Sequence, residues 1–311
     1  MRSWFFLFSC NLMWALQFTC VKLVQDQVGA LFTVWGPMTL STLMLYPLVR
    51  AERRQDSAPN PPAPSGERRW KDAWSYLLLA ALGVFPAQVL TTWGTRMSLA
   101  SNAALISLTI PISMAIMAVL ILGERMTAAR WVSFGLAITG VLLCSSSDLR
   151  HMDFSRGLWA GNLLVFAGTM GSSFINTYGK KMMERYTPMQ MLYYMYVASF
   201  VILTPLVLVQ EPDVFRRIPY FTGQTWIGLI LLTFFHNFLS MVLFLKALKK
   251  LDAIQAALSI YLVTFFGVPI AAIWLGERLT LAGIAGGVLV LGSTLLITLW
   301  EQKLAAPRAA S

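Results

Sequence analysis

The segment L-G-E-R-M-T at residues 122–127 recurs as L-G-E-R-L-T at residues 275–280, an offset of 153 residues. The same register extends upstream, where residues 100–105 match 253–258 at four positions. From 98 to 143, 14 of 46 positions are identical in the two copies. Abundant alanine and leucine inflate such a count, but composition does not explain G-E-R-x-T at the end of an apolar stretch. The chain is therefore predicted to consist of two halves, residues 1–148 and 149–311.

The composition excludes an ordinary soluble protein. Of the 311 residues, 57% are hydrophobic and 12% are charged, whereas soluble domains are about 25% charged. A helix that spans a membrane needs about 20 apolar residues. Ten such segments can be marked: 4–24, 30–49, 74–95, 99–122, 128–145, 158–179, 189–209, 223–245, 253–275 and 281–300. We expect an all-α integral membrane protein with ten transmembrane helices, the first of them an uncleaved span rather than a signal peptide.

Five predicted spans in each half determine the expected geometry. Because five is odd, the second half enters the membrane from the side opposite to the first. The two halves are thus predicted to be inverted five-helix repeats, a common plan of transporters that use alternating access. A duplicated but static helix bundle is the alternative.

The net charge of +10 is distributed unevenly between the two predicted sides. With the N-terminus in the cytoplasm, 17 of the 24 lysines and arginines lie inside and 7 outside. This positive-inside bias predicts a multi-pass membrane protein with both termini cytoplasmic. Anionic lipid of the bilayer accounts for the charge, so no nucleic-acid partner is expected. The proline-rich loop 50–73 is predicted to be a solvated cytoplasmic linker, with a PxxP docking site as the alternative.

Titratable side chains are almost absent from the predicted membrane interior. All 14 aspartates and glutamates lie outside the ten segments, and His236 is the titratable group near a span centre. A carboxylate-driven antiporter is therefore disfavoured, which leaves a facilitator, an exchanger or coupling through His236. The three cysteines have no metal-ligand spacing, so no metal site is expected. No cofactor is expected either, and the chain is predicted not to be an enzyme.

Neutral amides indicate where a polar cavity lies, because a buried carboxamide is costly unless it is hydrogen-bonded or hydrated. Asparagine and glutamine concentrate in spans 1, 3, 4, 6, 8 and 9, and three of these spans carry polar stripes at helical spacing. The resulting candidate substrate-binding residues are Trp14, Gln17, Gln88, Thr92, Asn102, Asn176, His236, Asn237 and Tyr261. Serines and threonines of such stripes also pack between helices and bond their own backbone. A satisfied interhelical histidine and packing aromatic rings are likewise alternatives.

The repeated junctions have a simpler interpretation. In each, a glycine ends one helix and a threonine can cap the next, so the intervening carboxylate is expected to accept hydrogen bonds from the amides of the following helix. The junction residues are Gly123, Glu124, Arg125, Gly276, Glu277 and Arg278. Pro111 and Pro269 are candidate hinges, with simple kinks as the alternative. Two GxxxG patterns, at 157–161 and 283–287, indicate close helix packing and leave a homodimer open.

Two five-span halves that each end in L-G-E-R-x-T resemble the drug/metabolite transporter superfamily, in particular its ten-span EamA-type permeases. The resemblance implies a carrier of the inner cell membrane that exports amino acids, metabolites or drugs through a central cavity formed by helices 1, 3, 4, 6, 8 and 9. Some distant relatives use a membrane-embedded glutamate in the first helix for proton coupling, but this chain has Trp14 and Gln17 there. The second repeat has Thr264 where the first has Pro111, so the two hinges need not be equivalent.

The favoured function is export of small amphipathic solutes by alternating access. The first alternative is a flippase for lipids or lipid-linked sugars with the same fold. A polytopic membrane enzyme is disfavoured because its only candidate cluster, His151 with Asp148 and Asp153, has no matching base or metal set.

Overall fold

A computed structural model describes residues 2–55, 74–97, 106–144, 156–263, 265–266 and 281–305. Within these ranges all regular secondary structure is helical, which confirms the all-α prediction. Each of the ten predicted segments contains at least one described helix. The following predicted features lie outside the described residues: Asn102, Pro269, Gly276, Glu277, Arg278, Thr264, the 148–153 cluster and the proline-rich part of loop 50–73.

The described helices divide between the two predicted halves of the chain. Those of the first half are α1 (Arg2–Ala15), α2 (Gln17–Val24), α3 (Ala30–Gln55), η1 (Leu79–Val84), α5 (Phe85–Met97), α7 (Thr109–Met117), η2 (Ala118–Leu122) and α8 (Ala128–Cys144). Those of the second half are α10 (Arg156–Met182), α11 (Pro188–Gln210), α12 (Val214–Arg217), η3 (Ile218–Tyr220), α13 (Gly223–Leu231), η4 (Leu232–Ser240), α14 (Met241–Leu248), α15 (Ala253–Ile260) and α17 (Leu281–Ala305).

Several of these helices are long and apolar enough to cross a membrane. Four qualify by length and hydropathy: Ser3–Val21, Trp74–Met97, Pro188–Gln210 and Gly223–Leu248. Shorter apolar helices cover Thr109–Leu122, Ala128–Leu143 and Ile284–Ile297. The chain is therefore a multi-pass membrane protein, and the count of ten crossings stays a prediction.

Local sequence signals fix where several helices begin and end. The Thr187 hydroxyl accepts the Gln190 amide at the start of α11, and the Thr222 hydroxyl accepts the Thr225 amide at the start of α13. Asp252 and Gln255 form a reciprocal capping box at the start of α15. These contacts satisfy amides that have no partner within their own helix. Gly123 ends η2 with φ +68°, a left-handed conformation that favours glycine.

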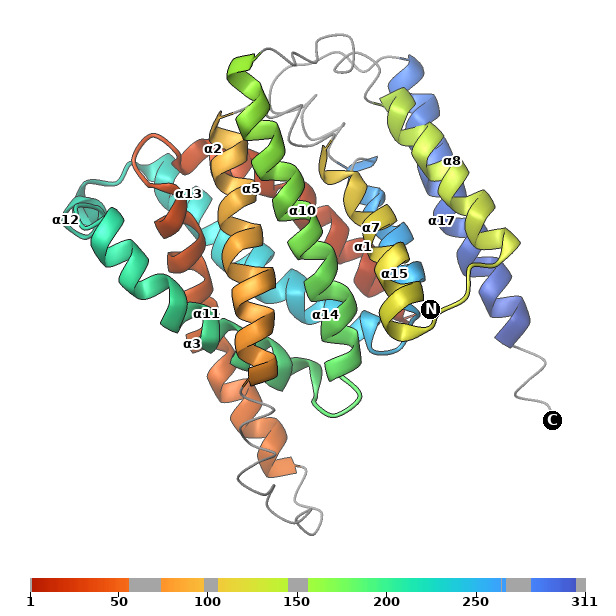
Figure 1. Cartoon of the computed structure of the whole chain (residues 1–311), viewed down its shortest axis with the longest axis horizontal. Helices are drawn as coiled ribbons and strands as arrows, with labels where there is room; N and C mark the ends of the chain where they lie inside the picture. Colours follow the sequence, from red (N-terminus) through yellow and green to blue (C-terminus); the bar gives the residue numbers. More distant parts are fainter. Residues whose placement is uncertain are drawn as a thin grey trace.

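The helices form two outer pairs around a central group (Figure 1). One edge is the antiparallel pair α8–α17, and the other edge is formed by α3 and α11, whereas α1, α5, α7, α10, α14 and α15 lie between them. Within the central group α10 packs against α5 and α7, α1 against α14 and α15, and α7 against α15. The central helices are those of predicted spans 1, 3, 4, 6, 8 and 9.

Glycines let the paired helices approach closely. A Cβ atom at Gly140 of α8 would lie 2.7 Å from the Gly286 carbonyl oxygen of α17. A Cβ atom at Gly94 of α5 would lie 2.6 Å from the Gly161 carbonyl oxygen of α10. The GxxxG segments of predicted spans 6 and 10 thus supply close contacts inside the chain, and the homodimer that they suggested stays a prediction.

Interruptions of helical geometry concentrate in the central group. The first span changes from α1 to α2 at Leu16, and a turn at Leu108 precedes Pro111, which lies buried in the first turn of α7. Three π-helical segments, η1, η2 and η4, occupy predicted spans 3, 4 and 8. The described parts of α3, α8, α11 and α17 are continuous α-helices. Such local irregularities are frequent at functional sites.

Candidate functional site

Side chains of α1 make polar contacts with two helices of the second half. Asn11 is 0% exposed, and its Nδ2 donates to the Leu7 carbonyl at 2.7 Å and to the Ser259 hydroxyl of α15 at 3.2 Å. One turn later, Trp14 Nε1 donates to the Ser240 hydroxyl at the end of η4, at 3.0 Å. The Ser240 hydroxyl in turn donates to the His236 carbonyl. We call Asn11, Trp14, His236, Ser240 and Ser259 the central polar cluster.

Two atoms of the central polar cluster are buried without a hydrogen-bond partner, Asn11 Oδ1 and His236 Nδ1. A buried polar atom without a partner costs about 1–3 kcal/mol, so native proteins usually provide one. The amide oxygen accepts hydrogen bonds, and Nδ1 of a neutral imidazole accepts or donates according to its tautomer. A ligand donor group would satisfy Asn11 Oδ1, and a ligand donor or acceptor would satisfy His236 Nδ1 according to its tautomer.

Asn237 was predicted as a binding residue, but the structure directs its side chain to its own helix. Asn237 Nδ2 donates to the Leu232 carbonyl, five residues earlier, at 2.8 Å. The Asn237 carbonyl accepts the Tyr196 hydroxyl of α11 at 2.7 Å. Both contacts fit the π-helical geometry of η4. In a π-helix the backbone bonds run between residues five apart, so carbonyls such as those of Leu232 and Asn237 are not held by the usual i→i−4 hydrogen bonds. In this structure Asn237 therefore supports the backbone.

Four predicted binding residues are not joined to the central polar cluster by hydrogen bonds in the described part of the chain. Thr92 is buried in α5, where its hydroxyl donates to the carbonyl of half-buried Gln88 at 2.8 Å. Asn176 is buried in α10, the helix that packs against α5 and α7. Tyr261 is 1% exposed, and its ring meets Phe134 of α8 edge to face at 6.2 Å. No hydrogen bond between described residues joins these four to the cluster.

Of the nine predicted binding residues, Trp14 and His236 belong to the central polar cluster. Gln17 opens α2 directly after the interruption at Leu16 and is half-buried. Sequence reasoning missed Asn11, Ser240 and Ser259 as binding candidates. Asn11 did carry a signal, because a carboxamide in a predicted span needs a partner or water. Ser240 carried one too, because it belongs to the polar stripe of predicted span 8, whereas nothing in the sequence separates Ser259 from the other membrane serines.

The polar stripe of predicted span 6 joins two helices. The Thr169 hydroxyl of α10 lies 3.3 Å from that of Thr109 in α7. The Ser173 hydroxyl donates to the Ile110 carbonyl at 3.2 Å. One turn later Thr177, which is not part of the predicted stripe, donates its hydroxyl to the Met114 carbonyl at 3.5 Å. In α10 these hydroxyls thus hold α10 against α7, which is the packing alternative for such stripes.

The Glu124 carboxylate contacts a different helix from the one predicted. It accepts the amides of Ala253 and Ile254, at 2.7 and 3.0 Å, at the N-terminus of α15 in the second half. The expectation that it caps the next helix, α8, is therefore wrong; the Thr127 hydroxyl accepts the Arg130 amide there, at 3.3 Å. A carboxylate next to a helix N-terminus is stabilised by the unpaired amides and by the helix dipole.

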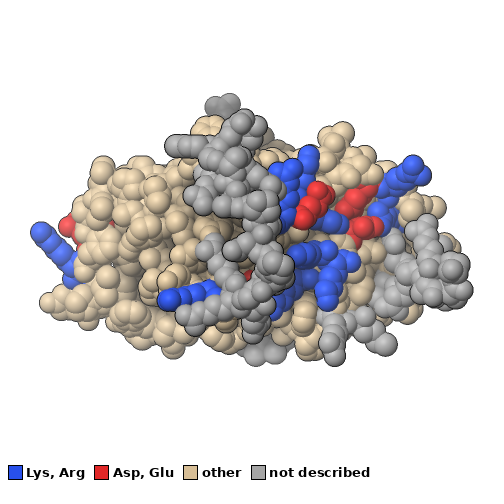
Figure 2. Space-filling model, turned by 90° about the horizontal axis from the view of Figure 1, so that it is seen from below, with Lys and Arg blue, Asp and Glu red and all other residues tan. Residues whose placement is uncertain are grey.

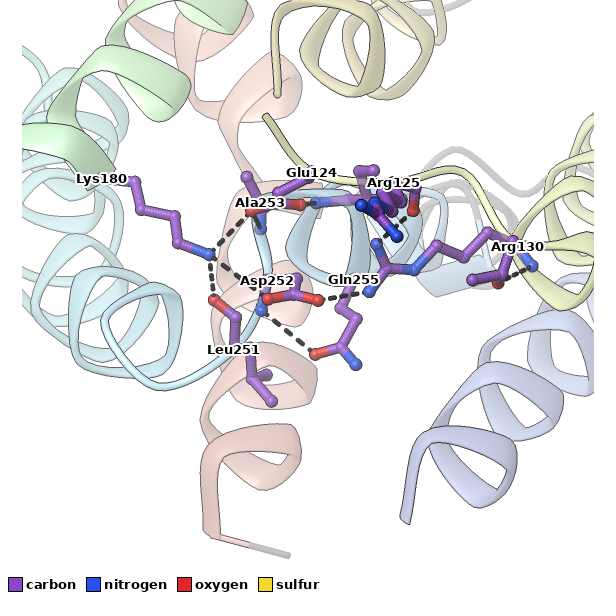
Figure 3. Close-up of polar contacts among 10 residues, drawn as sticks. Glu124, Arg125, Arg130, Lys180, Leu251, Asp252, Ala253 and Gln255 are labelled. Carbon is purple, nitrogen blue, oxygen red and sulfur yellow. Dashed lines mark hydrogen bonds and ion pairs between the residues drawn. The ribbon is translucent and has the colours of Figure 1, made fainter. Parts of the chain in front are cut away.

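Glu124 belongs to a network of charged groups from both halves (Figure 3). Lys180 of α10 donates to Glu124 Oε1 at 2.9 Å and to the Leu251 carbonyl at 2.6 Å. Asp252 accepts from Arg130 of α8 and lies 3.9 Å from Lys180 Nζ. The side chains of Glu124 and Arg130 are 10% and 5% exposed. We call Glu124, Arg130, Lys180 and Asp252 the four-residue ion network.

The ion network lies at the end of the molecule that holds the turns 183–187 and 249–252 and the two ends of the described chain (Figure 1). Figure 2 shows that lysine and arginine side chains gather on this face, with acidic side chains among them. Residues that the charge distribution assigned to the cytoplasm, such as Arg130, Lys180 and Lys249, lie at this end. Within the described residues, no group of three or more His, Cys, Asp and Glu side chains could hold a metal ion.

The family follows from a match that covers both halves of the chain. The EamA-like transporter family matches residues 1–146 and, a second time, residues 159–299. The chain belongs to the EamA-like transporter family. It is therefore a membrane transporter, and the resemblance carried by the paired L-G-E-R-x-T segments is confirmed. The boundary at 148/149 lies between the two matches and stays a prediction.

Curated relatives are also described as transporters. The chain is 28% identical over 236 residues to a probable terminal-alkyne amino-acid exporter of Streptantibioticus cattleyicolor, covering 75% of this chain and 76% of the relative. It is 24% identical over 222 residues to the uncharacterized transporter YyaM of Bacillus subtilis, covering 71% and 72%. A solved crystal structure superimposes with a TM-score of 0.76 over 96% of this chain and 98% of the other. At 14% identity this likeness shows the fold alone.

Proposed function

We propose that this transporter is a secondary carrier that exports small amphipathic solutes by alternating access of two inverted five-helix repeats. The central polar cluster is the proposed binding region, and the observation that carries this assignment is its pair of buried, unpartnered atoms, Asn11 Oδ1 and His236 Nδ1. They lie on helices of different halves, so a bound solute would contact both halves while these exchange conformations.

Helix pairing supports the inverted arrangement. An inverted repeat exchanges span 1 with 6, 2 with 7, 3 with 8, 4 with 9 and 5 with 10. Three observed pairs, α3–α11, α7–α15 and α8–α17, map onto themselves under this exchange. The pair α10–α5 maps onto the pair of α1 with η4 and α14, and α10–α7 maps onto α1–α15. Any pseudo-two-fold axis would generate this pattern, and the antiparallel course of the equivalent helices α8 and α17 favours an axis in the membrane plane (Figure 1).

The chemistry of the cluster favours a solute with both a donor group and an apolar part. Its polar side chains are uncharged amide, imidazole and hydroxyl groups. The Trp14 ring lies beside them and packs on Phe244 at 4.8 Å. An amino acid with an apolar side chain has this character, and the Streptantibioticus relative is described as a probable amino-acid exporter. We therefore place amino-acid-like metabolites first among the substrates to test.

Reconstituted vesicles provide the test. Purified protein is first screened by thermal shift against amino acids, metabolites and drugs, and the ligands that stabilise it are then used in counterflow. Ser259→Ala removes the hydroxyl that Asn11 contacts and should lower uptake about 2- to 12-fold, since one hydrogen bond contributes about 0.5–1.5 kcal/mol. Asn11→Leu removes both the donor and the unpartnered acceptor and should lower uptake further.

Ser199→Ala is the matched control. Ser199 and Ser259 are both fully buried serines whose hydroxyls donate to a carbonyl of their own helix, at 2.8 and 2.7 Å. Ser199 lies on α11, outside the central polar cluster. If Ser259→Ala transports every active solute as well as Ser199→Ala does, the binding region is misplaced. If no solute shows counterflow with the unmodified protein, the carrier mechanism itself fails.

A further inference from the structure

The four-residue ion network joins helix ends of both halves at one face of the molecule. Glu124 and Arg130 come from the first half, and Lys180 and Asp252 come from the second. We propose that this network is a latch that holds the cytoplasmic face closed and must break when the carrier opens inward. The proposal rests on the carrier function proposed above and assigns a gate to it.

The latch closes the face because it fixes the N-terminus of α15. All eight residues of α15 are buried, and its first turn receives the Glu124 carboxylate. Lys180 holds the same turn from α10 through the Leu251 carbonyl, and Arg130 holds it from α8 through Asp252. Because α7, which continues into η2, packs along α15, separating these two helices at this end would break both Glu124–amide bonds.

Charge balance stabilises the closed latch. Two carboxylates face two cations, so the network is neutral as a whole. Arg130 also donates to the Arg125 carbonyl at 2.9 Å, which fixes its position. The side chains of Lys180 and Asp252 are 20% and 47% exposed, so water compensates part of their charge, whereas the little-exposed Glu124 and Arg130 depend on their partners. Substitution of one member should therefore shift the equilibrium toward the open face.

The sequence indicates that the latch is one-sided. At the repeat offset of 153 residues, Arg130 corresponds to Gly283 and Asp252 corresponds to Leu99. The second junction keeps a glutamate, Glu277, but its sequence lacks the arginine–aspartate pair. Unequal stabilisation of the two faces gives the resting carrier a preferred orientation, with the cytoplasmic face closed.

Cysteine accessibility tests the latch without any substrate. In a background that lacks Cys10, Cys20 and Cys144, Ser259→Cys places one thiol in the central polar cluster. A membrane-impermeant maleimide is then applied to inside-out and right-side-out vesicles. Lys180→Gln and Arg130→Gln should raise the rate of labelling from the cytoplasmic side roughly 5- to 30-fold, the range of a 1–2 kcal/mol shift in a two-state equilibrium. Labelling from outside should fall.

Glu124→Gln and Glu211→Gln form a matched pair. Glu211 accepts the amides of Leu31 and Phe32, at 3.0 and 2.9 Å, so it also caps a helix of the opposite half. It lies outside the ion network, at the end of α11. Glu124→Gln should raise cytoplasmic labelling, whereas Glu211→Gln should not.

The outcomes separate the possibilities. Unchanged labelling in Lys180→Gln and Arg130→Gln, with protein that elutes as a single species and keeps its unfolding temperature, would overturn the latch. A rise of equal size from both sides would overturn it too, because this indicates general loosening. Lys180→Gln keeps the Glu124 cap on α15, so it remains informative if Glu124→Gln does not fold. Since labelling needs no solute, a carrier without transport and a carrier without a latch give different results.

Discussion

Acidic residues near helix ends connect the two halves of this chain, as three glutamates show: Glu124, Glu211 and Glu52. Glu124 caps α15 and Glu211 caps α3, each across the boundary between the halves. Glu52 at the end of α3 accepts the hydroxyl of Thr187, the N-cap of α11. The first amides of a helix lack partners within the helix, and a carboxylate supplies an acceptor and a complementary charge. Single side chains thus tie one half to the other.

Gly123 provides a test at this scale. A Cβ atom added there would meet nothing within 4 Å, so backbone conformation alone opposes substitution. Gly123→Ala should destabilise the protein by about 1–2 kcal/mol, the cost of a left-handed residue with a side chain, and lower its thermal unfolding midpoint. Asparagine enters this conformation more readily, so Gly123→Asn should be milder. Equal midpoints for the two variants would contradict this account.

Among the helical elements, the π-helical segments η1 and η4 begin at equivalent positions of the two halves. η1 begins at Leu79 and η4 at Leu232, 153 residues apart, which is the offset of the L-G-E-R-x-T segments. The first half has Gly83 and Val84 where the second has His236 and Asn237. The backbone irregularity is therefore common to both halves, whereas the polar side chains within it belong to the second. A π segment also rotates the helix that follows it, so residues spaced for a regular α-helix no longer share one face. Asn237, which bonds the Leu232 carbonyl, lies in such a segment.

Two glycines of α8 test helix packing with a built-in control. A Cβ atom at Gly140 would lie 2.7 Å from the Gly286 carbonyl and 2.9 Å from Val290 atoms of α17, whereas one at Gly135 would meet nothing within 4 Å. Gly140→Val should cost about 1–3 kcal/mol, because backbone cannot move aside as a side chain can. Gly135→Val should leave stability nearly unchanged. The comparison is made on thermal unfolding in detergent, and equal losses would mean that the α8–α17 contact is wrong.

For the whole molecule, sidedness is the property on which the carrier mechanism depends. The span Gly223–Leu248 is 26 residues long, and at about 1.5 Å per residue its helix is long enough to cross the hydrocarbon core. The turn after it, 249–252, lies at the end of the molecule that carries the ion network, and the segment before it, 211–222, lies at the other end (Figure 1). The charge distribution assigns these two ends to the cytoplasm and the outside.

Two exposed positions test this assignment. Lys249→Cys and Arg216→Cys each remove one positive charge from an exposed residue. The 17:7 distribution becomes 16:7 in the first variant and 17:6 in the second, so the positive-inside bias remains in both. The thiol at 249 should react with an impermeant reagent in inside-out vesicles, and the thiol at 216 in right-side-out vesicles. Reaction of both in the same vesicles would contradict a single crossing between them and remove the basis for inverted halves.

The sequence predicts the large features well, for clear physical reasons. Apolar length and the scarcity of charge predict an all-helical membrane protein, because hydrocarbon requires backbone groups to be paired within the segment. The duplicated G-E-R-x-T junctions predict the internal repeat and the family. The binding residues stay a prediction. Trp14 and His236 are in the central polar cluster, but Asn237 bonds the Leu232 carbonyl of its own helix and Tyr261 packs on Phe134.

The sequence alone determined that the chain lies in a lipid bilayer, that it contains a repeat and which family it belongs to. Each of these follows from local composition or from a pattern within one chain. Only the tertiary structure decided which groups meet. Glu124 bonds Ala253, 129 residues away, and Asn11 bonds Ser259, 248 residues away. These partners are set by how helices pack against one another and where the π segments interrupt them. A side chain's spacing along its own helix does not determine which other helix it will face.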